Sequence, residues 1–275
     1  MILRWTIRVV LVLLLMAAAV CYFHPPARFA LKSLWAKSTG APGPNPPRYS
    51  PTSQERADWD KPPPPYGPAP RGPATIQQRL DQYGPVARWR LAAHFKRAGV
   101  AYPPDELVLV GIKHTWQLEV WARTGQGTPM RRVATYPILA GSGTLGPKLR
   151  EGDGQVPEGL YRIESLNPNS SYHLSLRVSY PNDFDRRNAA AEGRRNLGGD
   201  IMIHGSNCSV GCLAMGDPAS EDLFVMASDT GLDSTSIILT PVDFRVRNLP
   251  PDTTPQPGWT KALYQDIRRK LGELK

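Results

Sequence analysis

Prolines are concentrated in one stretch of this chain, and that stretch limits where a fold can form. Twelve of the 29 prolines lie in residues 42–73, including a run of four at residues 62–65. Such a segment has too few aliphatic side chains to offset its ordering entropy, so it favours extended polyproline conformations. We therefore predict a linker over residues 41–74, either a semi-rigid spacer or a disordered segment, and a folded domain that begins at residue 75.

The N-terminal residues have the pattern of an export signal. Two arginines precede an uncharged apolar run at residues 9–23, a pattern typical of a secretory signal peptide. Extended back to Trp5, the run reaches the length of a signal anchor. We expect residues 1–40 to be a cleaved signal or an inner-membrane anchor formed by residues 5–23, with a basic flank. The rest of the chain would then lie in the periplasm or cell envelope.

Charge and cysteine content exclude several classes of protein. The net charge is +9 at pH 7, but five of these nine charges lie in residues 1–40, which contain no acid. The remaining surplus is too small to indicate a nucleic-acid partner. Three cysteines are too few for a disulfide scaffold, and Cys21 lies in the apolar run.

Beyond residue 75, the hydrophobic pattern predicts a domain that is mainly β with a few α-helices. Alternating or continuous apolar residues predict strands at residues 107–112, 116–120, 159–163, 172–178, 200–204 and 235–239. We take residues 75–250 as this domain.

Four helices are predicted around these strands. Gly84 and Pro85 separate two of them, at residues 75–83 and 86–98, with Val86, Trp89 and Ala93 as the apolar stripe of the second. A third helix begins with Asp217 as its N-cap. The last spans residues 260–275 in a C-terminal tail (residues 251–275), and its apolar stripe is expected to pack on the domain.

Residues 201–217 carry the residues most suited to chemistry. His204 follows a predicted strand, and a glycine-rich loop then leads to Cys208 and Cys212. A base near a thiol raises the thiolate fraction needed for nucleophilic attack on a carbonyl. Three other interpretations stay open: a Cys208–Cys212 disulfide, a metal site with three soft ligands, and a buried histidine beside two apolar cysteines.

Residues 204–212 read His-Gly-Ser-Asn-Cys-Ser-Val-Gly-Cys, which resembles the active-site signature of the L,D-transpeptidase (YkuD-like) catalytic domain. The resemblance is closest to the YafK-like murein L,D-transpeptidase/amidase branch. It extends to Gly-Pro-Lys at 146–148, to Pro-Glu-Gly-Leu-Tyr at 157–161 and to Gly-Gly-Asp at 198–200. In all it covers roughly residues 85–247.

This resemblance implies an L,D-transpeptidase-like β-sandwich or barrel that acts without a metal or cofactor. It assigns Cys212 as the nucleophile and His204 as the proton donor and acceptor, with the Gly205 backbone orienting the imidazole. Ser209 and Gly211 would shape the loop, and the backbone amides of Gly211 and Cys212 would hold the oxyanion.

Candidate substrate-binding residues lie outside this loop. Lys148, Arg150 and Glu151 belong to a glycine-rich stretch that could border a substrate cleft. His173 lies on the polar side of its predicted strand and could face the site. Charged residues in loops are more often solvated than bound to a substrate. For His173, a position on the surface is at least as common as one that faces the site.

The function implied by the resemblance is L,D-transpeptidation of diaminopimelate-containing peptidoglycan stem peptides through a cysteine thioester, in cell-wall biogenesis. Val210 and Ala214 replace the His and Arg of the widespread family pattern, so hydrolysis is the alternative outcome. The hydrolytic form would be an amidase that releases an outer-membrane lipoprotein from peptidoglycan. Two non-enzymatic hypotheses are a wall-binding module with oxidised Cys208 and Cys212, and a tethered scaffold that acts through its Pro-rich segment.

Overall fold

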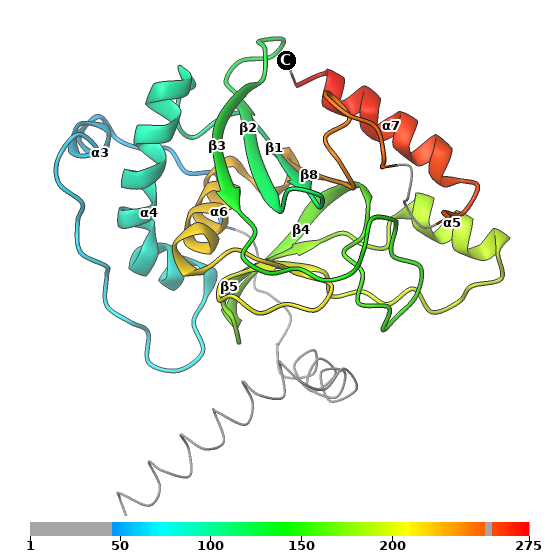
Figure 1. Ribbon diagram of the computed structural model, residues 1–275. Helices are drawn as coiled ribbons and strands as arrows, with labels where there is room; N and C mark the ends of the chain where they lie inside the picture. The colour runs from blue at the N-terminus through cyan, green and yellow to red at the C-terminus, as the bar shows by residue number, and fades with distance from the viewer. Residues whose placement is uncertain (1–45, 251–254, 275) are drawn as a thin grey trace, which may run out of the picture. The chain divides into compact units, whose positions relative to one another are not determined.

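A mixed β-sheet forms the centre of the computed structural model, which describes residues 46–250 and 255–274 (Figure 1). In this part of the chain, eight strands follow the order β3-β2-β1-β8-β4-β5-β6-β7. Their bounds are β1 (Glu106–Ile112), β2 (Gln117–Arg123), β3 (Arg131–Pro137), β4 (Gly159–Ser170), β5 (His173–Val178), β6 (Met202–His204), β7 (Leu213–Ala214) and β8 (Thr235–Thr240). The prediction of a mainly β domain with a few helices is confirmed.

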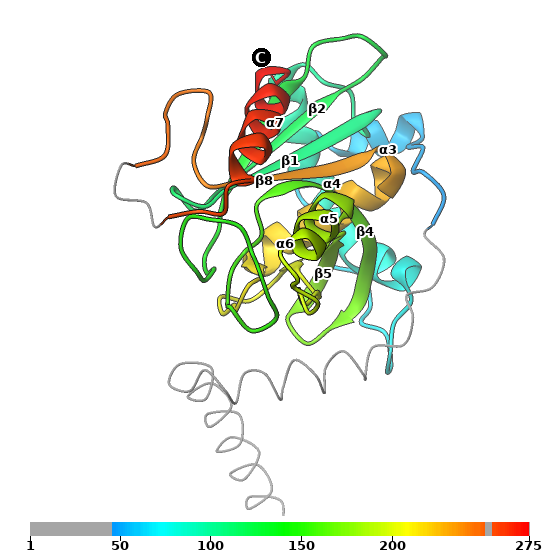
Figure 2. The same ribbon diagram turned by 90° about the vertical axis from the view of Figure 1, so that its right-hand side faces the viewer.

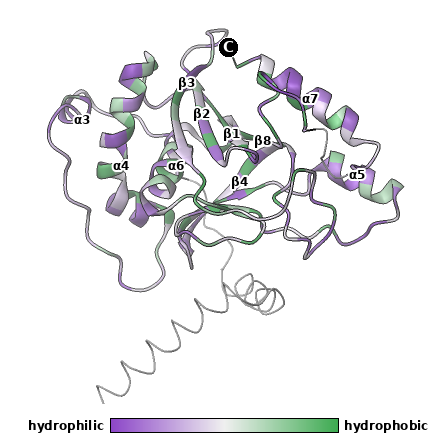
Figure 3. Cartoon of the chain, viewed as in Figure 1, coloured by the Kyte–Doolittle hydropathy of each residue, from purple (hydrophilic) through white to green (hydrophobic). Residues whose placement is uncertain are grey.

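Helices cover the sheet from two sides. Figures 1 and 2 show α3, α4 and α6 on one side and α5 and α7 on the other. The described helices are α3 (Ser53–Asp58), α4 (Ile76–Ala98), α5 (Asp183–Ala191), α6 (Asp217–Thr230) and α7 (Thr260–Gly272), with a 3-10 turn, η1 (Leu232–Ser234). Hydrophilic and hydrophobic residues alternate along α4 and α7, as expected for helices with one buried face (Figure 3).

The central strand β1 is buried on both faces. Leu107 and Leu109 belong to a hydrophobic cluster shared with α4 and α6. Val108 and Val110 belong to a second cluster, which includes Ile267 of α7. A strand covered on both faces has no polar side, which explains the continuous apolar run in its sequence.

Strand β4 joins two parts of the sheet. Its first residues, from Gly159 to Arg162, pair with β8, whereas the residues from Ile163 onward pair with β5. The register shifts twice along the β4–β5 pair. Irregular pairing of this kind bends a strand, so β4 can contribute to both parts.

The predicted break at Gly84 and Pro85 is wrong, because α4 is one helix that contains Pro85. Pro85 has no N–H to donate to the carbonyl of Asp81, four residues before it, and the helix nevertheless continues to Ala98. The predicted stripe is also wrong, since Ala87, Leu91 and Phe95 are the buried residues of this half of α4. The predicted end of the helix at residue 98 is confirmed, and Gly99 follows it with a left-handed backbone.

Buried ion pairs join α4 to α6. Arg88 makes two hydrogen bonds of 2.8 Å to the Asp229 carboxylate. Arg90 bonds Asp222 at 2.7 Å and Glu221 at 2.9 Å. Burial raises the pKa of Asp222 to about 6 even though Arg90 acts in the opposite direction. The acidic side chains of α6 therefore hold this helix against α4.

The described part of the Pro-rich segment, from residue 46, packs on the domain. The Tyr49 amide donates to the Asp229 carbonyl at 3.2 Å, and its ring lies 3.8 Å from the Arg88 guanidinium carbon. Helix α3 follows, and Arg56 donates to the Tyr102 carbonyl at 2.9 Å. This differs from the extended spacer predicted from composition, because aromatic and arginine side chains supply contacts that the aliphatic content does not predict.

The C-terminal helix α7 also packs on the sheet. Leu263, Ile267 and Leu271 are buried, as its apolar stripe predicts. The Tyr264 hydroxyl donates to Glu158 at 2.8 Å, and Glu158 accepts from Lys113 at 2.9 Å.

No helix within the described ranges has both the length and the apolar character needed to cross a membrane. The signal or anchor predicted for residues 5–23 lies outside the described residues.

Candidate active site

The loop between β6 and β7 brings the predicted chemical residues to adjacent strands. These two strands are parallel, and Ile203 pairs with Leu213 while His204 pairs with Ala214. Strand β6 is held on its other edge by antiparallel pairing with β5. His204 thus ends one strand, and Cys212 immediately precedes the neighbouring one.

Asp217 fixes the turn that follows His204. Its Oδ1 accepts a hydrogen bond from the Ser206 amide at 2.8 Å, and Ser206 has a positive φ of 61°. The prediction that Asp217 is the N-cap of α6 is wrong: Gly216 occupies that position without a side-chain cap. The Asp217 carboxylate holds the histidine turn in place of capping its own helix.

Gly205 has no room for a side chain. A Cβ at this position would lie 2.5 Å from Asp217 Oδ1 and 2.8 Å from both the His173 Cβ and the Tyr172 carbonyl oxygen. Such contacts are closer than Cβ atoms normally make. The close packing requires glycine here for space and holds the Gly205 carbonyl in place.

The His204 imidazole is buried and oriented. Its Nδ1 lies 2.6 Å from the Gly205 carbonyl oxygen, and because that oxygen can only accept, Nδ1 carries the proton. The Tyr172 ring lies against the imidazole with centroids 4.8 Å apart. In the neutral ring, this tautomer leaves Nε2 as the proton acceptor.

The Cys212 thiol lies against the start of β6. Its Sγ accepts from the Met202 amide and donates to the Asp200 carbonyl, both at 3.4 Å. A backbone N–H directed at sulfur stabilises negative charge on it. Cys208 and Cys212 are both thiols and form no disulfide with each other.

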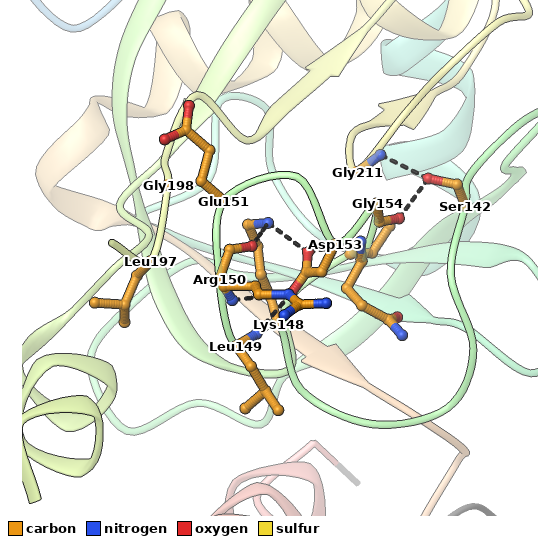
Figure 4. Close-up of polar contacts among 12 residues, drawn as sticks. Ser142, Lys148, Leu149, Arg150, Glu151, Asp153, Gly154, Leu197, Gly198 and Gly211 are labelled. Atoms are coloured by element: carbon orange, nitrogen blue, oxygen red, sulfur yellow. Dashed lines mark hydrogen bonds and ion pairs between the residues drawn. The ribbon is translucent and has the colours of Figure 1, made fainter. Parts of the chain in front are cut away.

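The two amides predicted to hold an oxyanion both donate to serine hydroxyls. The Cys212 amide donates to Ser209 Oγ at 3.1 Å, which gives Ser209 a role in shaping the loop. The Gly211 amide donates to Ser142 Oγ at 2.7 Å (Figure 4). Sequence reasoning missed Ser142, because it reaches the loop from a segment far away in the chain, and only its glycine neighbours signal a special turn.

Lys148 and Asp153 hold the glycine-rich stretch together (Figure 4). Lys148 is buried, and its Nζ donates to Asp153 at 2.6 Å and to the Arg150 carbonyl at 2.8 Å. Burial alone would raise the pKa of Asp153, but Lys148 and three backbone amides outweigh it and lower that pKa. The Lys148 ammonium is thus engaged within its own loop.

The other predicted substrate-binding residues lie in different surroundings. Arg150 and Glu151 are exposed, and Glu151 accepts from the Asn196 amide group at 2.7 Å. His173 Nε2 lies 3.0 Å from Glu221 Oε1, and its ring contacts Tyr83 edge to face. The His173 backbone therefore lies beside Gly205, while its imidazole bonds a residue of α6.

No group of three or more His, Cys, Asp or Glu side chains is arranged to hold a metal ion among residues 46–250 and 255–274. The chemistry available at the loop is that of a thiol, an oriented imidazole and a set of backbone amides.

The part of the chain that contains this site is similar to a known family. Residues 110–242, from within β1 to just beyond β8, match the family model described as the L,D-transpeptidase catalytic domain (YkuD). Over these residues the chain is similar to L,D-transpeptidase catalytic domains. Both chemical residues of the loop lie inside the match.

Individual relatives are similar over part of their length. The Escherichia coli protein YafK is 34% identical over 109 residues, which are 39% of this chain and 41% of YafK. Among solved structures, Bdellovibrio bacteriovorus Bd1075 aligns at 20% identity over 62% of this chain and 56% of its own, with a TM-score of 0.37. The helical cell shape determining protein Pgp2 of Campylobacter jejuni aligns at 21% identity over 50% and 47%, with a TM-score of 0.38.

Proposed function

We propose that this protein is a cysteine L,D-transpeptidase that modifies peptidoglycan in cell-wall biogenesis. The observation that carries the proposal is the β6–β7 loop, which places a buried thiol and an imidazole with a fixed tautomer on adjacent strands. The family match over residues 110–242 supports the substrate class. The substrate would be a stem peptide that contains diaminopimelate.

In this proposal, His204 Nε2 takes the proton of the Cys212 thiol, and the Gly205 carbonyl holds the imidazole through Nδ1. The thiolate attacks the carbonyl carbon after the L-centre of diaminopimelate, forming a C–S bond while the carbonyl electron pair moves to oxygen. Backbone amides of Gly211 and Cys212 stabilise that oxyanion. Collapse breaks the C–N bond, and the imidazolium protonates the leaving amine.

The second step decides between transfer and hydrolysis. An acceptor amine attacks the thioester, forms a new amide and returns the thiol through proton transfer from His204. Water in place of the amine would give an amidase, including one that frees a peptidoglycan-linked lipoprotein. We favour transfer because the matched family is defined by that reaction.

We further propose the export of this domain. Residues 1–40 would act as a signal or anchor, residues 41–74 as the connection to the domain, and residues 75–250 as the catalytic domain in the periplasm. An anionic cell wall suits the modest positive charge of the chain beyond residue 40.

The test is mass spectrometry of muropeptides incubated with the wild-type protein, with Cys212→Ala and with Cys208→Ala. Cys208 lies in the same loop and is the matched thiol control. We expect new diaminopimelate cross-links with the wild type and Cys208→Ala and none with Cys212→Ala. Trimmed peptides or freed lipoprotein would instead indicate the amidase. Identical products from the wild type and Cys212→Ala would show that the thiol has no catalytic role.

A further inference from the structure

A short segment after β3 extends the sheet beyond β7. The Leu139 amide donates to the Ala214 carbonyl at 2.8 Å, and the Ala214 amide donates to the Ala140 carbonyl at 2.9 Å. Ala140 and Ala214 form an antiparallel bridge. Two residues beyond this isolated bridge, Ser142 reaches the loop that precedes β7, where it accepts a hydrogen bond from the amide of Gly211, the residue before Cys212.

The Ser142 hydroxyl makes two hydrogen bonds at this position. It accepts from the Gly211 amide at 2.7 Å and donates to the Gly154 carbonyl at 2.6 Å (Figure 4). Gly211 has a positive φ of 75°, a conformation that glycine adopts readily, and its N–H points to this hydroxyl. An N–H has one hydrogen, and the Ser142 oxygen occupies the position to which that hydrogen points.

An acyl oxygen that binds the Gly211 amide must therefore lie next to Ser142 Oγ. The hydroxyl cannot withdraw far, because its backbone pairs with β7 through Leu139 and Ala140. A hydroxyl beside an anion lowers the energy by donating its proton, and O–H···O⁻ bonds are among the strongest in proteins. Gly154 is only partly buried, so water can replace the serine at its carbonyl.

We propose that Ser142 is an oxyanion donor of the acyl-transfer site, a role that rests on the function proposed above. In the resting protein, the Ser142 hydroxyl oxygen accepts the hydrogen bond of the Gly211 amide. When the tetrahedral intermediate forms, the O–H turns from the Gly154 carbonyl to the oxyanion. The oxyanion then shares the Gly211 N–H with Ser142 Oγ and accepts the Ser142 O–H.

The experiment compares two reactions of the Cys212 thiol in the full chain. Acylation by p-nitrophenyl acetate forms a C–S bond, passes through an oxyanion and expels p-nitrophenolate. Alkylation by iodoacetamide forms a C–S bond and expels iodide without any oxyanion. The variants are Ser142→Ala, Ser142→Thr, Cys212→Ala and, as a control in the same segment, Thr144→Val, whose hydroxyl accepts from Gln155 at 3.1 Å.

We expect Ser142→Ala to slow acylation by about 100-fold, the usual effect of losing one oxyanion donor, with no change in alkylation. Ser142→Thr keeps the hydroxyl and should keep most of the acylation rate, and Thr144→Val should match the wild type. Equal losses in both reactions would reduce Ser142 to a structural role and overturn the proposal. Unchanged or faster acylation by Ser142→Ala would also overturn it, because the hydroxyl would then be a mere occupant.

The Cys212→Ala variant separates this proposal from the proposed function. If it releases p-nitrophenolate as fast as the wild type, the nucleophile assignment fails and the Ser142 role fails with it. If release depends on Cys212 but not on Ser142, only the oxyanion donor is wrong.

Discussion

The packing around Gly205 predicts a large effect of adding one methyl group. In Gly205→Ala, the new Cβ would meet Asp217 Oδ1 at 2.5 Å and both the His173 Cβ and the Tyr172 carbonyl at 2.8 Å. The Tyr172 carbonyl oxygen and the His173 Cβ are fixed by the backbone. Rotation of a side chain therefore cannot relieve these two clashes. We expect overpacking to lower the free energy of unfolding by about 3 kcal/mol.

The measurement is urea unfolding followed by tryptophan fluorescence, which reports a change in midpoint at constant slope. Gly199→Ala is the matched control, since the nearest atom to its Cβ would be the Tyr180 carbonyl oxygen at 3.9 Å. That variant should stay within about 0.5 kcal/mol of the wild type. Because the clash moves the carbonyl that orients His204, folded Gly205→Ala should also lose Cys212-dependent acylation. A Gly205→Ala protein as stable as the control would refute this account of the packing.

Three further predictions concern stability. Arg88→Met leaves the buried Asp229 carboxylate without its partner and should lower the free energy of unfolding in urea by about 3–5 kcal/mol. Adding Asp229→Asn should recover part of this loss. No recovery would argue against an unpaired charge as the cause. Burial raises the pKa of Asp185 to about 6. The folded protein therefore binds this proton more tightly than the unfolded chain does. The protonated carboxyl makes its full contribution to the free energy of unfolding below the unfolded-chain pKa, at about pH 4. This contribution is lost as pH rises through 6, so the wild type should lose about 3 kcal/mol relative to Asp185→Asn between about pH 3 and about pH 7. A pH-independent difference would contradict the burial effect. Ile267→Ala should lower the free energy of unfolding by about 2–4 kcal/mol by opening a cavity under α7, while the exposed Lys270→Ala should not; equal effects would mean that α7 does not pack as described.

Patterns that depend on nearby residues predicted the structure best. The strands at β1, β2, β5 and β8 follow from their apolar patterns, and Gly99 ends α4 as its conformational freedom predicts. Strand β3 was missed because its sequence, Arg-Arg-Val-Ala-Thr-Tyr-Pro, has few alternating apolar positions. Helix α5 is polar and was also missed, although Asn182 and Asp185 form a capping box at its start.

Features set by distant residues could not be predicted from local pattern. Pro85 lies inside the continuous helix α4, and the Asp217 carboxylate accepts from the Ser206 amide while Gly216 is the N-cap of α6. In the candidate site, too, residues close together in the chain could be predicted and distant ones could not. His204 and Cys212 stand out in the sequence because a short loop joins them. Ser142 does not, because only the Ala140–Ala214 bridge brings it to the loop.

The parallel pairing of β1 with β8 has a consequence for the order of folding. Leu107 pairs with Thr235, so the middle of the sheet stays incomplete until nearly the whole domain is available. The β1–β2–β3 ribbon can form early from local contacts, whereas the cysteine loop precedes β8 in the chain and is placed before its supporting sheet is closed. A chain that emerges N-terminus first would therefore expose the cysteine loop before β8 can complete the sheet, and reactivity of Cys212 should appear only after β8 has been released.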